Sequence, residues 1–526
     1  MPDVLPSSAR TLSLLTCAEM AQCDRWAMGQ GTPGVVLMEA AGRAVAEAIR
    51  ARWSPRPVLV VCGPGNNGGD GHVIARLLHE AGWPVRWRLS VPLNALHGDA
   101  AHHAQRTATV LSAAALGRED LEGTSLVVDA VFGAGLTRPV DGLGADVLRR
   151  ARDAGVPIVA VDVPSGVHGD TGADWGATAA DLTVTFFRKK RGHVLMPGRA
   201  LCGELLVRDI GIADAALDAT CASPPSGTPH ENAPLLWQAD WAYPVDGRVN
   251  HRGAADLHKY ARGHAVVLGG AVMTGAARLA ARAAARVGAG LTTLLVPQQV
   301  WPVYATALLC SMVQALDDGD GNALSAAWTR HLGQLKWHSL VMGPGAALGL
   351  PGDDASATLR SLVIDALMLA QGRGVVLDAD ALTAFEAQPE TLFRAVAGPV
   401  VLTPHEGEFR RLFGHLSEAD KIARTREAAR VSGAVVLHKG PDTVVACPEG
   451  RVVVNTNGPA GLATAGSGDV LSGLIGGLLA QGVPAFEAAC AAAWVHGEAA
   501  QAFGPGLLAD DLPEQVPAVL RRLWGR

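Results

Sequence analysis

The sequence predicts an α/β protein of two domains, each built on a parallel sheet with helices on both faces. Short apolar runs alternate with helical patterns along the whole chain, and this alternation is typical of βαβ units. A stretch rich in Pro, Ser and Gly at 221–234 separates two complete α/β patterns. A chain of 526 residues is long enough for roughly two to four domains. We therefore place one domain at 1–225 and the other at 236–526.

The first half contains several apolar runs that we expect to form buried strands. They span 58–62, 85–89, 126–129, 157–162, 182–187 and 205–207. The helical patterns before or between them span 38–51, 72–81 and 145–154. This alternation of strands and helices indicates a parallel sheet with helices on both faces.

The second half repeats this alternation with longer, alanine-rich helices. The expected strands span 265–268, 291–296, 340–342, 375–377, 400–402, 434–437, 444–446 and 451–454. The main expected helices span 275–287, 468–480 and 485–502. Because the two halves carry different motifs, they are not expected to be duplicates of one another.

The composition argues against several classes of function. The chain is 49% hydrophobic and 18% charged, with a net charge of −6 and no long basic run. Neither a nucleic-acid partner nor a membrane surface is therefore expected. The longest uncharged stretch, 287–316, contains two prolines and does not predict a membrane span. The eight cysteines are scattered without a CxxC pair, which indicates a reducing, cytoplasmic location.

Polar residues follow the strands of the first half, at the edge where open α/β sheets bind ligands. The first strand runs into the glycine loop GPGNNGGDG at 63–71, and later strands run into Asp129, Asp162 and the RKKR segment at 188–191. The loop matches the dinucleotide fingerprint G-x-G-x-x-G, but the second strand ends without an acid to hold a ribose. A tight Asn-Gly turn is the alternative interpretation of this loop.

These polar side chains favour a cation site. Oxygens of Asn67, Asp129 and Ser165 could surround a hard monovalent cation, and backbone amides of the loop could bind a phosphate. Structural roles are the alternatives, because Asp129 could cap a helix and Asp162 could order the Pro-Ser-Gly turn that follows it.

The strongest signal of the second half is NGPAGLATAGSGDV at 457–470. Its glycines open a helix, whose free N–H groups and dipole form an anion site. Asp469 is placed there as a base, the alternative being an ordinary acid of a first helical turn. Lys439 follows a neighbouring strand and is one of only six lysines, so we expect it to bind phosphate. His405 follows another strand, where a capping role is the alternative.

The motifs together resemble those of the bifunctional NAD(P)H-hydrate repair enzymes across nearly the full chain. Similarity to the NAD(P)HX epimerase domain rests on LMEAAG at 37–42, GPGNNGGDG at 63–71, VDAVFGAGL at 128–136 and DVPSG at 162–166. Similarity to the ADP-dependent (S)-NAD(P)H-hydrate dehydratase rests on HKYARGH at 258–264, GAARLAARAAARVGAGL at 275–291, TPHEGE at 403–408, HKG at 438–440 and GLATAGSGDVLSG at 461–473. The resemblance implies a Rossmann-like three-layer sandwich followed by a ribokinase-like fold.

The resemblance also implies which residues form each site. In the first domain it implies substrate contacts at Asn66, Asn67, Gly68, Gly69, Asp70, Gly133, Ala134, Gly135, Leu136, Thr137, Arg138, Pro139 and Asp162, and potassium at Asn67, Asp129 and Ser165. In the second it implies substrate contacts at Ala276, Gly345, His405 and Asp469, and nucleotide contacts at Lys439, Gly440, Pro441, Asp442, Thr443 and Gly468. Asp162 and Asp469 are the predicted catalytic residues. Lys189 and Lys190 are both candidates for a lysine of the first site.

The implied function is repair of hydrated NADH and NADPH. The first domain would interconvert the R and S epimers with K⁺, and the second would dehydrate the S epimer with Mg²⁺ and ADP, giving AMP and phosphate. Expected partners are NADHX, NADPHX and ADP, and the chain is expected to form a homo-oligomer. One alternative is a small-molecule kinase fused to a binding domain, against which HKYARGH and TPHEGE argue. A non-enzymatic nucleotide sensor is the other, against which Asp162 and Asp469 argue.

Overall fold

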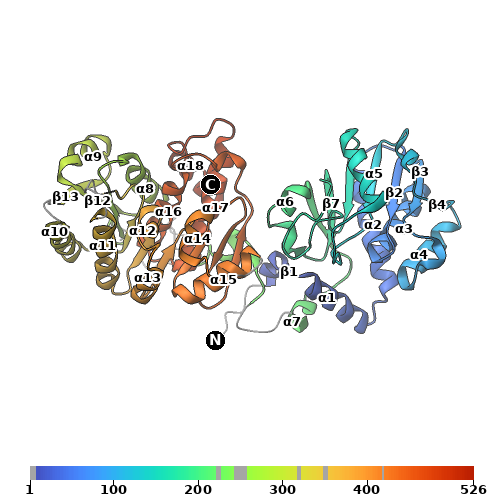
Figure 1. Ribbon diagram of the computed structural model, residues 1–526, viewed down its shortest axis with the longest axis horizontal. Helices are drawn as coiled ribbons and strands as arrows, with labels where there is room; N and C mark the ends of the chain where they lie inside the picture. Colours follow the sequence, from blue (N-terminus) through green and yellow to red (C-terminus); the bar gives the residue numbers. More distant parts are fainter. Residues whose placement is uncertain are drawn as a thin grey trace. The chain divides into compact units, whose positions relative to one another are not determined.

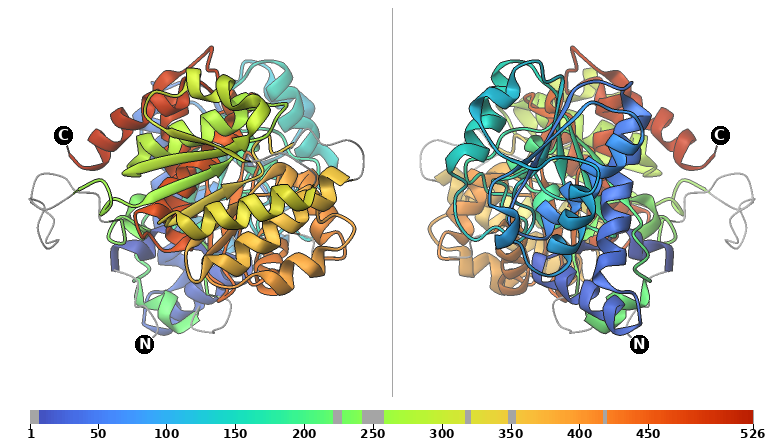
Figure 2. Two further views of the ribbon diagram at one scale, coloured as in Figure 1. Left: turned by 90° about the vertical axis from the view of Figure 1, so that its left-hand side faces the viewer. Right: turned by 90° about the vertical axis from the view of Figure 1, so that its right-hand side faces the viewer.

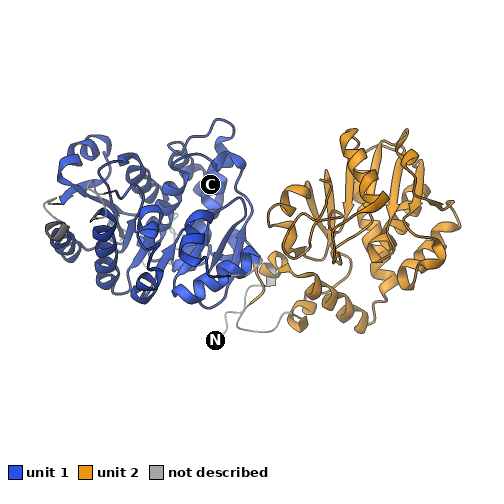
Figure 3. Cartoon of the chain, in the orientation of Figure 1, with its two compact units in different colours: residues 1–5, 230–526 blue, residues 6–229 orange. Residues whose placement is uncertain are grey.

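A computed structural model describes residues 7–220, 227–241, 258–316, 321–347, 354–416 and 420–525. The chain forms two compact units, one of residues 6–229 and the other mainly of residues 230–526 (Figure 3). The first six residues of the predicted linker, 221–226, lie outside the described residues. Its end is not a linker, because β10 (His230–Glu231) pairs with β19 (Val452–Asn455) of the second unit.

The first unit is built on a seven-stranded parallel sheet (Figure 1). In spatial order its strands are β4 (Ala114–Ala115), β3 (Val85–Leu89), β2 (Val58–Cys62), β5 (Leu126–Ala130), β6 (Ile158–Val161), β7 (Leu182–Phe186) and β9 (Glu204–Arg208). The chain changes direction across the sheet between β2 and β5, which is where a ligand crevice opens in such sheets. A separate parallel pair joins β1 (Leu14–Leu15) to β8 (Lys189–Lys190).

Helices cover both faces of this sheet. Alternate residues of a strand point to opposite faces, and Val58 and Val60 accordingly join one buried cluster while Leu59 and Val61 join another. The first cluster includes α1 (Cys17–Gly29), α2 (Gly34–Arg52), α3 (Asn66–Glu80), α4 (Gly98–Ala108) and α7 (Ala215–Thr220), and the second includes α5 (Gly142–Asp153). In the right-hand view of Figure 2, the blue helices and the teal helix α5 flank the strands. The unit is therefore a three-layer, Rossmann-like sandwich, as predicted.

Helix α3 begins at Asn66, so the prediction of a helix from 72 is wrong by six residues. Most of the predicted glycine loop is helical because its glycines allow very close packing. A Cβ on Gly68 would lie 2.0 Å from the carbonyl oxygen of Gly63, and a Cβ on Gly71 would lie 2.8 Å from Cys62 Sγ. Closely packed interiors leave no room for such an atom. Glycine therefore lets α3 begin almost directly at the end of β2.

The second unit is built on a ten-stranded sheet. After β10 and β19, its strands in spatial order are β18 (Thr443–Ala446), β17 (Val435–His438), β16 (Val400–Leu402), β15 (Gly374–Leu377), β14 (Ser339–Met342), β11 (His264–Leu268), β12 (Leu291–Pro297) and β13 (Met312–Leu316). Neighbouring strands are parallel except at β18, which is antiparallel to both β17 and β19. The carboxyl ends of β11, β14, β15, β16 and β17 therefore share one edge of the sheet.

Two helical layers enclose this sheet. One layer contains α8 (Thr274–Val287), α16 (Ser467–Ala480), α17 (Ala485–Phe503) and α18 (Leu512–Leu523). The other contains α10 (Gly321–Gln334), α11 (Asp354–Ala370), α13 (Pro389–Ala395) and α15 (Lys421–Ser432), which contact one another in that order. In the left-hand view of Figure 2, the red C-terminal helices and the yellow helix α11 lie on opposite sides of the strands. Shorter helices are α9 (Trp301–Ala307), α12 (Ala379–Thr383) and α14 (Glu406–Phe413).

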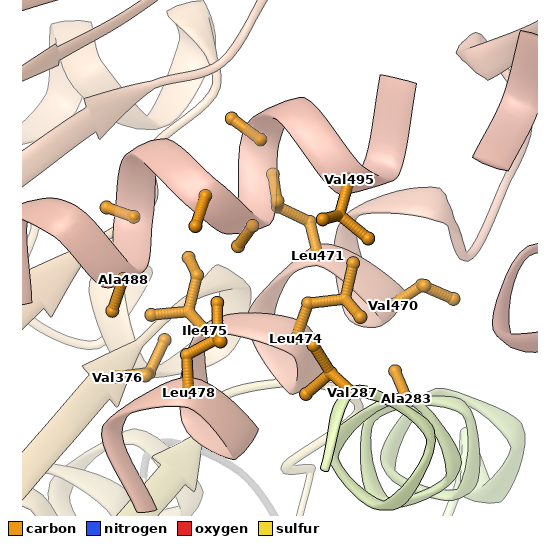
Figure 4. Close-up of a cluster of buried hydrophobic side chains, with 14 of the residues drawn as sticks. Ala283, Val287, Val376, Val470, Leu471, Leu474, Ile475, Leu478, Ala488 and Val495 are labelled. Atoms are coloured by element: carbon orange, nitrogen blue, oxygen red, sulfur yellow. The ribbon is translucent and has the colours of Figure 1, made fainter. Parts of the chain in front are cut away.

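Helices α8 and α16 pack closely in the core of the second unit. A Cβ on Gly473 would lie 2.1 Å from the carbonyl oxygen of Ala280, and one on Gly477 would lie 2.6 Å from that of Ala284. Around this crossing, the leucines of α16 join a buried cluster with α8, α17 and the strands (Figure 4). Fully burying a leucine contributes about 1.5–3 kcal/mol. The core therefore fixes the position of α16, whose first turn carries the predicted anion site.

Every predicted strand is confirmed, with both ends within one residue of the prediction. The elements that the sequence analysis missed include helix α1 and the edge strand β13. Helix α1 has only three buried side chains, Met20, Cys23 and Ala27, among its 13 residues. Strand β13 is mostly half-exposed and carries Gln314. Both elements lack the continuous apolar pattern that identifies a buried segment.

Candidate active sites

A cavity of about 500 Å³ lies in the crevice of the first unit, beyond the carboxyl ends of β2, β5 and β6. Small-molecule sites commonly have volumes of about 300–1,000 Å³. Helix α1, the start of α2, the start of α3 and the loop after β5 form its wall. The polar residues of the wall are Cys17, Asp24, Asn66, Asn67, Asp70, Asp99, Asp162 and Lys190.

The structure brings most of the predicted substrate contacts of the first domain to this cavity. Those in its wall are Asn66, Asn67, Asp70, Gly133, Ala134, Gly135, Leu136 and Asp162. Gly68 and Gly69 lie in the first turn of α3 but face packed neighbours, since a Cβ on Gly69 would lie 2.5 Å from Met38 Sδ. The remaining predicted contacts are exposed and lie outside the wall: Thr137, Arg138 and Pro139.

Asp162 and Lys190 form a buried ion pair in the cavity wall. Lys190 Nζ lies 2.5 Å from Asp162 Oδ1, and both groups bond to Thr185 Oγ1, at 3.0 Å and 2.8 Å respectively. The Lys190 side chain is only 2% exposed. Burial alone would raise the pKa of Asp162, but the Lys190 ammonium and the hydrogen bonds hold that pKa below its ordinary value. Asp162 is therefore ionised at neutral pH, with a proton donor in contact.

The backbone at Asp162 is strained, and hydrogen bonds hold it in place. Its φ of +64° lies in the left-handed region, which costs a non-glycine residue about 1–3 kcal/mol. Its N–H donates to the Val184 carbonyl and its own carbonyl accepts from His193 Nε2, both at 2.8 Å. His193 Nδ1 accepts the Lys190 N–H at 2.9 Å. Burial and the Lys190 charge lower the pKa of His193 to about 4, so this ring is neutral.

The tertiary structure also distinguishes the two candidate lysines. Strand β8 pairs with β1, so that Leu14 lies opposite Lys189 and Leu15 lies opposite Lys190. Successive side chains of a strand point to opposite sides. Lys190 lines the cavity, whereas Lys189 is half-buried and is not part of the wall.

The three predicted potassium ligands lie beside the cavity. Ser165 Oγ lies 2.6 Å from Asp129 Oδ1 and 3.0 Å from the carbonyl oxygen of Phe132. Asn67 lies against the same loop, since a Cβ on Gly133 would be 2.9 Å from Asn67 Oδ1. Burial raises the pKa of Asp129, which is 1% exposed, although hydrogen bonds from Ser165 oppose the shift. Oxygen ligands around a buried carboxylate fit a hard cation.

The sequence analysis missed the contribution of α1 to this site. Asp24 and Cys17 both line the cavity, although no helix was predicted at their positions. The available signal was the spacing of Cys17, Asp24 and Met28, which places them on one face of a helix.

An open groove of about 590 Å³ lies at the carboxyl edge of the second sheet. The segments that follow β15, β16 and β17 form its wall, together with the start of α16. The predicted site residues in this wall are His405, Lys439, Gly440, Gly468 and Asp469. The other lining residues are Asp378, Ala379, Glu406, Glu408, Gly466 and Ser467.

Helix α16 begins at Ser467, and its N-cap Gly466 has a φ of +91°. No side chain caps this helix end, so backbone N–H groups of its first turn are available to an anion. Asp469 lies in the same turn. Burial and the nearby Asp378 carboxylate raise the pKa of Asp469 to about 6, against the opposing effect of Lys439. Asp469 is thus a stronger base than an ordinary aspartate and is still mostly ionised at neutral pH.

Lys439 lines the groove and forms an ion pair with the buried carboxylate of Asp378. Its Nζ lies 2.7 Å from Asp378 Oδ1 and 3.7 Å from Glu408 Oε2. Asp378 is 1% exposed and also accepts a hydrogen bond of 2.6 Å from Ser472 Oγ. Burial opposes the charge on Lys439, but the Asp378 and Glu408 carboxylates raise its pKa. The ammonium faces the helix end, since a Cβ on Gly468 would lie 3.5 Å from Nζ.

Hydrogen bonds from Lys421 and Thr443 fix the conformation of the predicted nucleotide loop at 439–443. Lys421 Nζ donates to Asp442 Oδ1 at 2.7 Å and lies 3.4 Å from the carbonyl oxygen of Lys439. Thr443 Oγ1 donates to the carbonyl oxygen of Gly440 at 2.8 Å. Of the predicted nucleotide contacts, three lie outside the groove wall: Pro441, Asp442 and Thr443.

His405 both caps a helix and lines the groove. Its Nδ1 accepts the Gly407 N–H at 2.9 Å, and its own N–H donates to Glu408 Oε2 at 2.8 Å. The capping alternative is therefore confirmed. The ring remains 55% exposed toward the groove, so the capping role leaves it accessible to a ligand.

Ala276 and Gly345 lie beside each other but outside the groove wall. A Cβ on Gly345 would lie 3.1 Å from Ala276 Cβ and 2.4 Å from the carbonyl oxygen of Met273. With a φ of +58° as well, this position requires glycine. Ala276 comes after β11 and Gly345 comes after β14, and both strands end at the same edge of the sheet as the groove.

Two features are absent from the described ranges. Their helices are all too short or too polar to cross a membrane. They also contain no group of three or more His, Cys, Asp or Glu side chains arranged to hold a metal ion.

Both halves of the chain match known families. Residues 34–192 match the family described as YjeF-related protein N-terminus, and residues 265–517 match the family described as NAD(P)H-hydrate dehydratase. The chain is 38% identical to the bifunctional NAD(P)H-hydrate repair enzyme Nnr of Moorella thermoacetica, over 97% of each protein. The chain belongs to this family. The enzyme of the same name from Salinibacter ruber is 34% identical, again over 97% of each protein.

Family membership confirms the resemblance and the fold class, with a ribokinase-like C-terminal half. Among solved structures, the chain is similar to the ADP/ATP-dependent NAD(P)H-hydrate dehydratase from Bacillus subtilis, co-crystallized with ATP/Mg²⁺. That match has 29% identity and a TM-score of 0.43, and it covers 52% of this chain and 94% of the other. The two family matches, at 34–192 and 265–517, fall in different units of the protein.

Proposed function

We propose that the protein repairs hydrated NADH and NADPH in two steps. The first unit interconverts the R and S epimers of NAD(P)HX. The second unit dehydrates the S epimer with ADP and releases NAD(P)H, AMP and phosphate. The observation that carries this proposal is that each unit has its own cavity with an aspartate of shifted pKa in the wall, Asp162 in the first and Asp469 in the second. A nucleotide sensor would need neither group.

The Asp162–Lys190 pair suits an epimerisation. This reaction breaks the C–O bond of the added hydroxyl and forms a new bond on the other face of the same carbon. The departing oxygen must gain a proton, so a positioned proton donor accelerates the step. Lys190 Nζ holds such a proton. The ionised Asp162, whose Oδ1 lies 2.5 Å from Nζ, balances the positive charge of this ammonium. Bonds from Thr185 and His193 keep the pair oriented.

Asn67, Asp129 and Ser165 would hold K⁺ beside the epimerase cavity. A bound potassium ion would supply a fixed positive charge next to the substrate loops. The same three residues would tie the start of α3 to the loop after β5 and to the turn after β6. Their role is therefore to order residues 133–136, which line the cavity.

The groove of the second unit suits phosphoryl transfer followed by elimination. Hydroxide is a poor leaving group, whereas a phosphorylated hydroxyl leaves readily. Asp469 would take the proton of the substrate hydroxyl as its oxygen attacks the terminal phosphorus of ADP. The N–H groups of the α16 first turn and the Lys439 ammonium would stabilise charge on the transferred group. Loss of phosphate and a ring proton then gives the reduced nicotinamide.

Mg²⁺ would assist in this groove. Its wall contains four carboxylates, and three of them, Asp378, Glu408 and Asp469, interact with one ammonium, Lys439. Magnesium is commonly held by one or two carboxylates and by substrate phosphates. Asp469 lies next to the anion site and would be repelled by a bare phosphate, so an ion held by the phosphate oxygens would share that charge. The bound ion would neutralise charge on the transferred phosphoryl group.

Three further expectations belong to the same proposal. The ligands are NADHX or NADPHX in both units and ADP in the second, bound by the residues assigned above from the family resemblance. The protein acts in the cytoplasm without nucleic acid or membrane partners. It functions as a homo-oligomer.

A single experiment tests the two steps together. Mixed R and S hydrates are incubated with the full chain, with and without ADP and Mg²⁺, and the absorbance of reduced nicotinamide is followed. With ADP, the wild type should recover both epimers. Asp162→Asn should recover only the S epimer at the normal rate, because epimerisation loses about 10²–10⁴-fold when an acid–base group is removed. Equal recovery of both epimers by Asp162→Asn would remove this residue from the mechanism.

The alternative of a small-molecule kinase is tested in the same assay. Vitamin-type alcohols replace the hydrates, and phosphorylated product is measured. The proposed function predicts turnover of the hydrates and none of the alcohols. The opposite result would assign the groove to a kinase.

A further inference from the structure

We infer that Asp24 is a second catalytic residue of the epimerase, the base that acts together with the Asp162–Lys190 pair. The inference rests on the proposed function of this cavity. Asp24 lies outside every motif that the sequence analysis identified, on helix α1. Its position in the cavity wall is a result of the tertiary structure.

Helix α1 turns one face toward the cavity. The lining residues on this face are Cys17, Met20, Ala21, Asp24 and Met28. Their spacing places them on one side of the helix. On the described lining face of α1, Asp24 is the one carboxyl, set between Met20 and Met28. A carboxyl on an apolar wall loses hydration without an evident structural gain, which points to a functional role.

Charged groups from several elements surround Asp24. Asp162 follows β6, Lys190 belongs to β8, and Asp70 belongs to α3. Arg25 is its neighbour on α1, and Asp99 of α4 lines the same cavity. Because Lys190 is already paired with Asp162, this ammonium balances only one of the carboxyls.

This environment gives the carboxyls of the cavity different proton affinities. Burial and the Asp162 charge raise the pKa of Asp24 to about 6, with Lys190 and Arg25 opposing the shift. Burial, with the charges of Asp162 and Asp24, raises the pKa of Asp70 well above its ordinary value. At neutral pH, Asp24 is mostly ionised, whereas Asp70 keeps its proton to a higher pH than an ordinary aspartate does. A general base is most effective when its pKa lies near the working pH, and Asp24 meets this condition.

Epimerisation needs proton transfer at two faces of one carbon. The C–O bond breaks with its electron pair on the oxygen, which takes the proton of Lys190 Nζ and leaves as water. A second water then donates an electron pair to the carbon from the other face and gives a proton to Asp24. Asp162 and Lys190 come from the strand ends, whereas Asp24 comes from α1, so the two proton-transfer groups belong to different elements that line the cavity. The reverse reaction exchanges donor and acceptor, and exchange with solvent returns a proton from Asp24 to Lys190 between turnovers.

The test compares three variants of the full chain with the wild type. Asp24→Asn removes the base, and Asp24→Glu keeps a carboxyl. Glu47→Gln is the matched control, because Glu47 is an exposed acid on α2. Conversion of the R to the S epimer is measured without ADP between about pH 5 and about pH 8, with the enzyme-free rate subtracted. ADP-dependent dehydration of the pure S epimer shows in each case that the protein is folded.

The expected results separate catalysis from structure. Asp24→Asn should lose about 10²-fold or more in kcat/KM for epimerisation and keep dehydration. The wild-type kcat/KM should rise with pH through about 6, where Asp24 ionises, and this limb should be absent in Asp24→Asn. Asp24→Glu should keep the limb at a reduced rate, and Glu47→Gln should match the wild type.

Two outcomes would overturn the inference. One is a wild-type rate in Asp24→Asn. The other is a slow Asp24→Asn in which the acid limb persists, because the titrating group would then be elsewhere. Failure of the proposed function is a different result, namely a wild type that does not epimerise the hydrates at all.

Discussion

Replacing Lys439 by methionine tests how the groove of the second unit balances its charges. Methionine keeps most of the side-chain length and removes only the ammonium. Lys439 Nζ lies 2.7 Å from Asp378 Oδ1. After the substitution, Asp378 keeps its hydrogen bonds from Ser472 Oγ at 2.6 Å and from the Ala379 N–H at 2.9 Å. Its negative charge then lies in a site that is 1% exposed and has lost its closest counter-charge.

The size of the effect follows from this geometry. Removing one partner of a buried ion pair destabilises a protein by about 3–5 kcal/mol. Because Asp378 keeps two hydrogen bonds and the Lys439 side chain is 19% exposed, we expect a loss of about 3 kcal/mol. For a large domain this corresponds to a fall in Tm of about 6 °C. The pKa of Asp469 should also rise above about 6, because Lys439 lowers it in the wild type.

Three measurements on the full chain check these expectations. Scanning calorimetry should show a lower Tm for the second unit, and titration calorimetry should show weaker ADP binding. The pH profile of dehydration should shift upward, because Asp469 would need a higher pH to ionise. Lys336→Met is the control, since Lys336 is an exposed lysine of the same unit.

An unchanged Tm together with an unchanged pH profile would refute the reasoning. Lys439 would then contribute nothing to the charge balance of Asp378 and Asp469. A loss of ADP binding alone would leave Lys439 as a nucleotide ligand and nothing more.

The remaining predictions concern the base, the cation and the domain boundary. Asp469→Asn should still bind AMP but lose dehydration by about 10²-fold or more, and the wild-type rate should rise with pH through about 6 because the base must be ionised; turnover near the wild-type rate would contradict this. Asp129→Asn should need more K⁺ for epimerisation while dehydration is unchanged, and an identical K⁺ titration would exclude Asp129 as a ligand. Fragments 1–229 and 230–526, cut where the two units divide, should each unfold in one cooperative calorimetric transition; if neither does, the domains are not independent.

The strands and the glycine motifs could be predicted from the sequence because their causes are local. Strand β2 (Val58–Cys62) is buried at every residue, so it appears in the sequence as an uninterrupted apolar run. The start of α16 was predicted within one residue, because Gly466 and Gly468 mark the helix end and Asp469 follows. The strands around these motifs end at one sheet edge, so the location of both sites could also be predicted.

The sequence could not predict all of the side chains that line the cavity of the first unit. Lys189 and Lys190 are adjacent and chemically identical, and only the pairing of β8 with Leu14 and Leu15 of β1 determines which one lines the cavity. Asp24 lies on a helix with few buried residues, and its pattern gives no indication that this helix closes a cavity.

Proton affinity depends even more on long-range contacts. Asp469 and Asp378 are far apart in the chain, yet the Asp378 charge helps to raise the pKa of Asp469 to about 6. A residue's type and its neighbours in sequence determine local conformation, whereas its hydration and the charges around it depend on which distant segments pack against it. The sequence therefore determined the elements and the strand ends at which the two cavities lie, and the tertiary structure decided which side chains line them and in which protonation state.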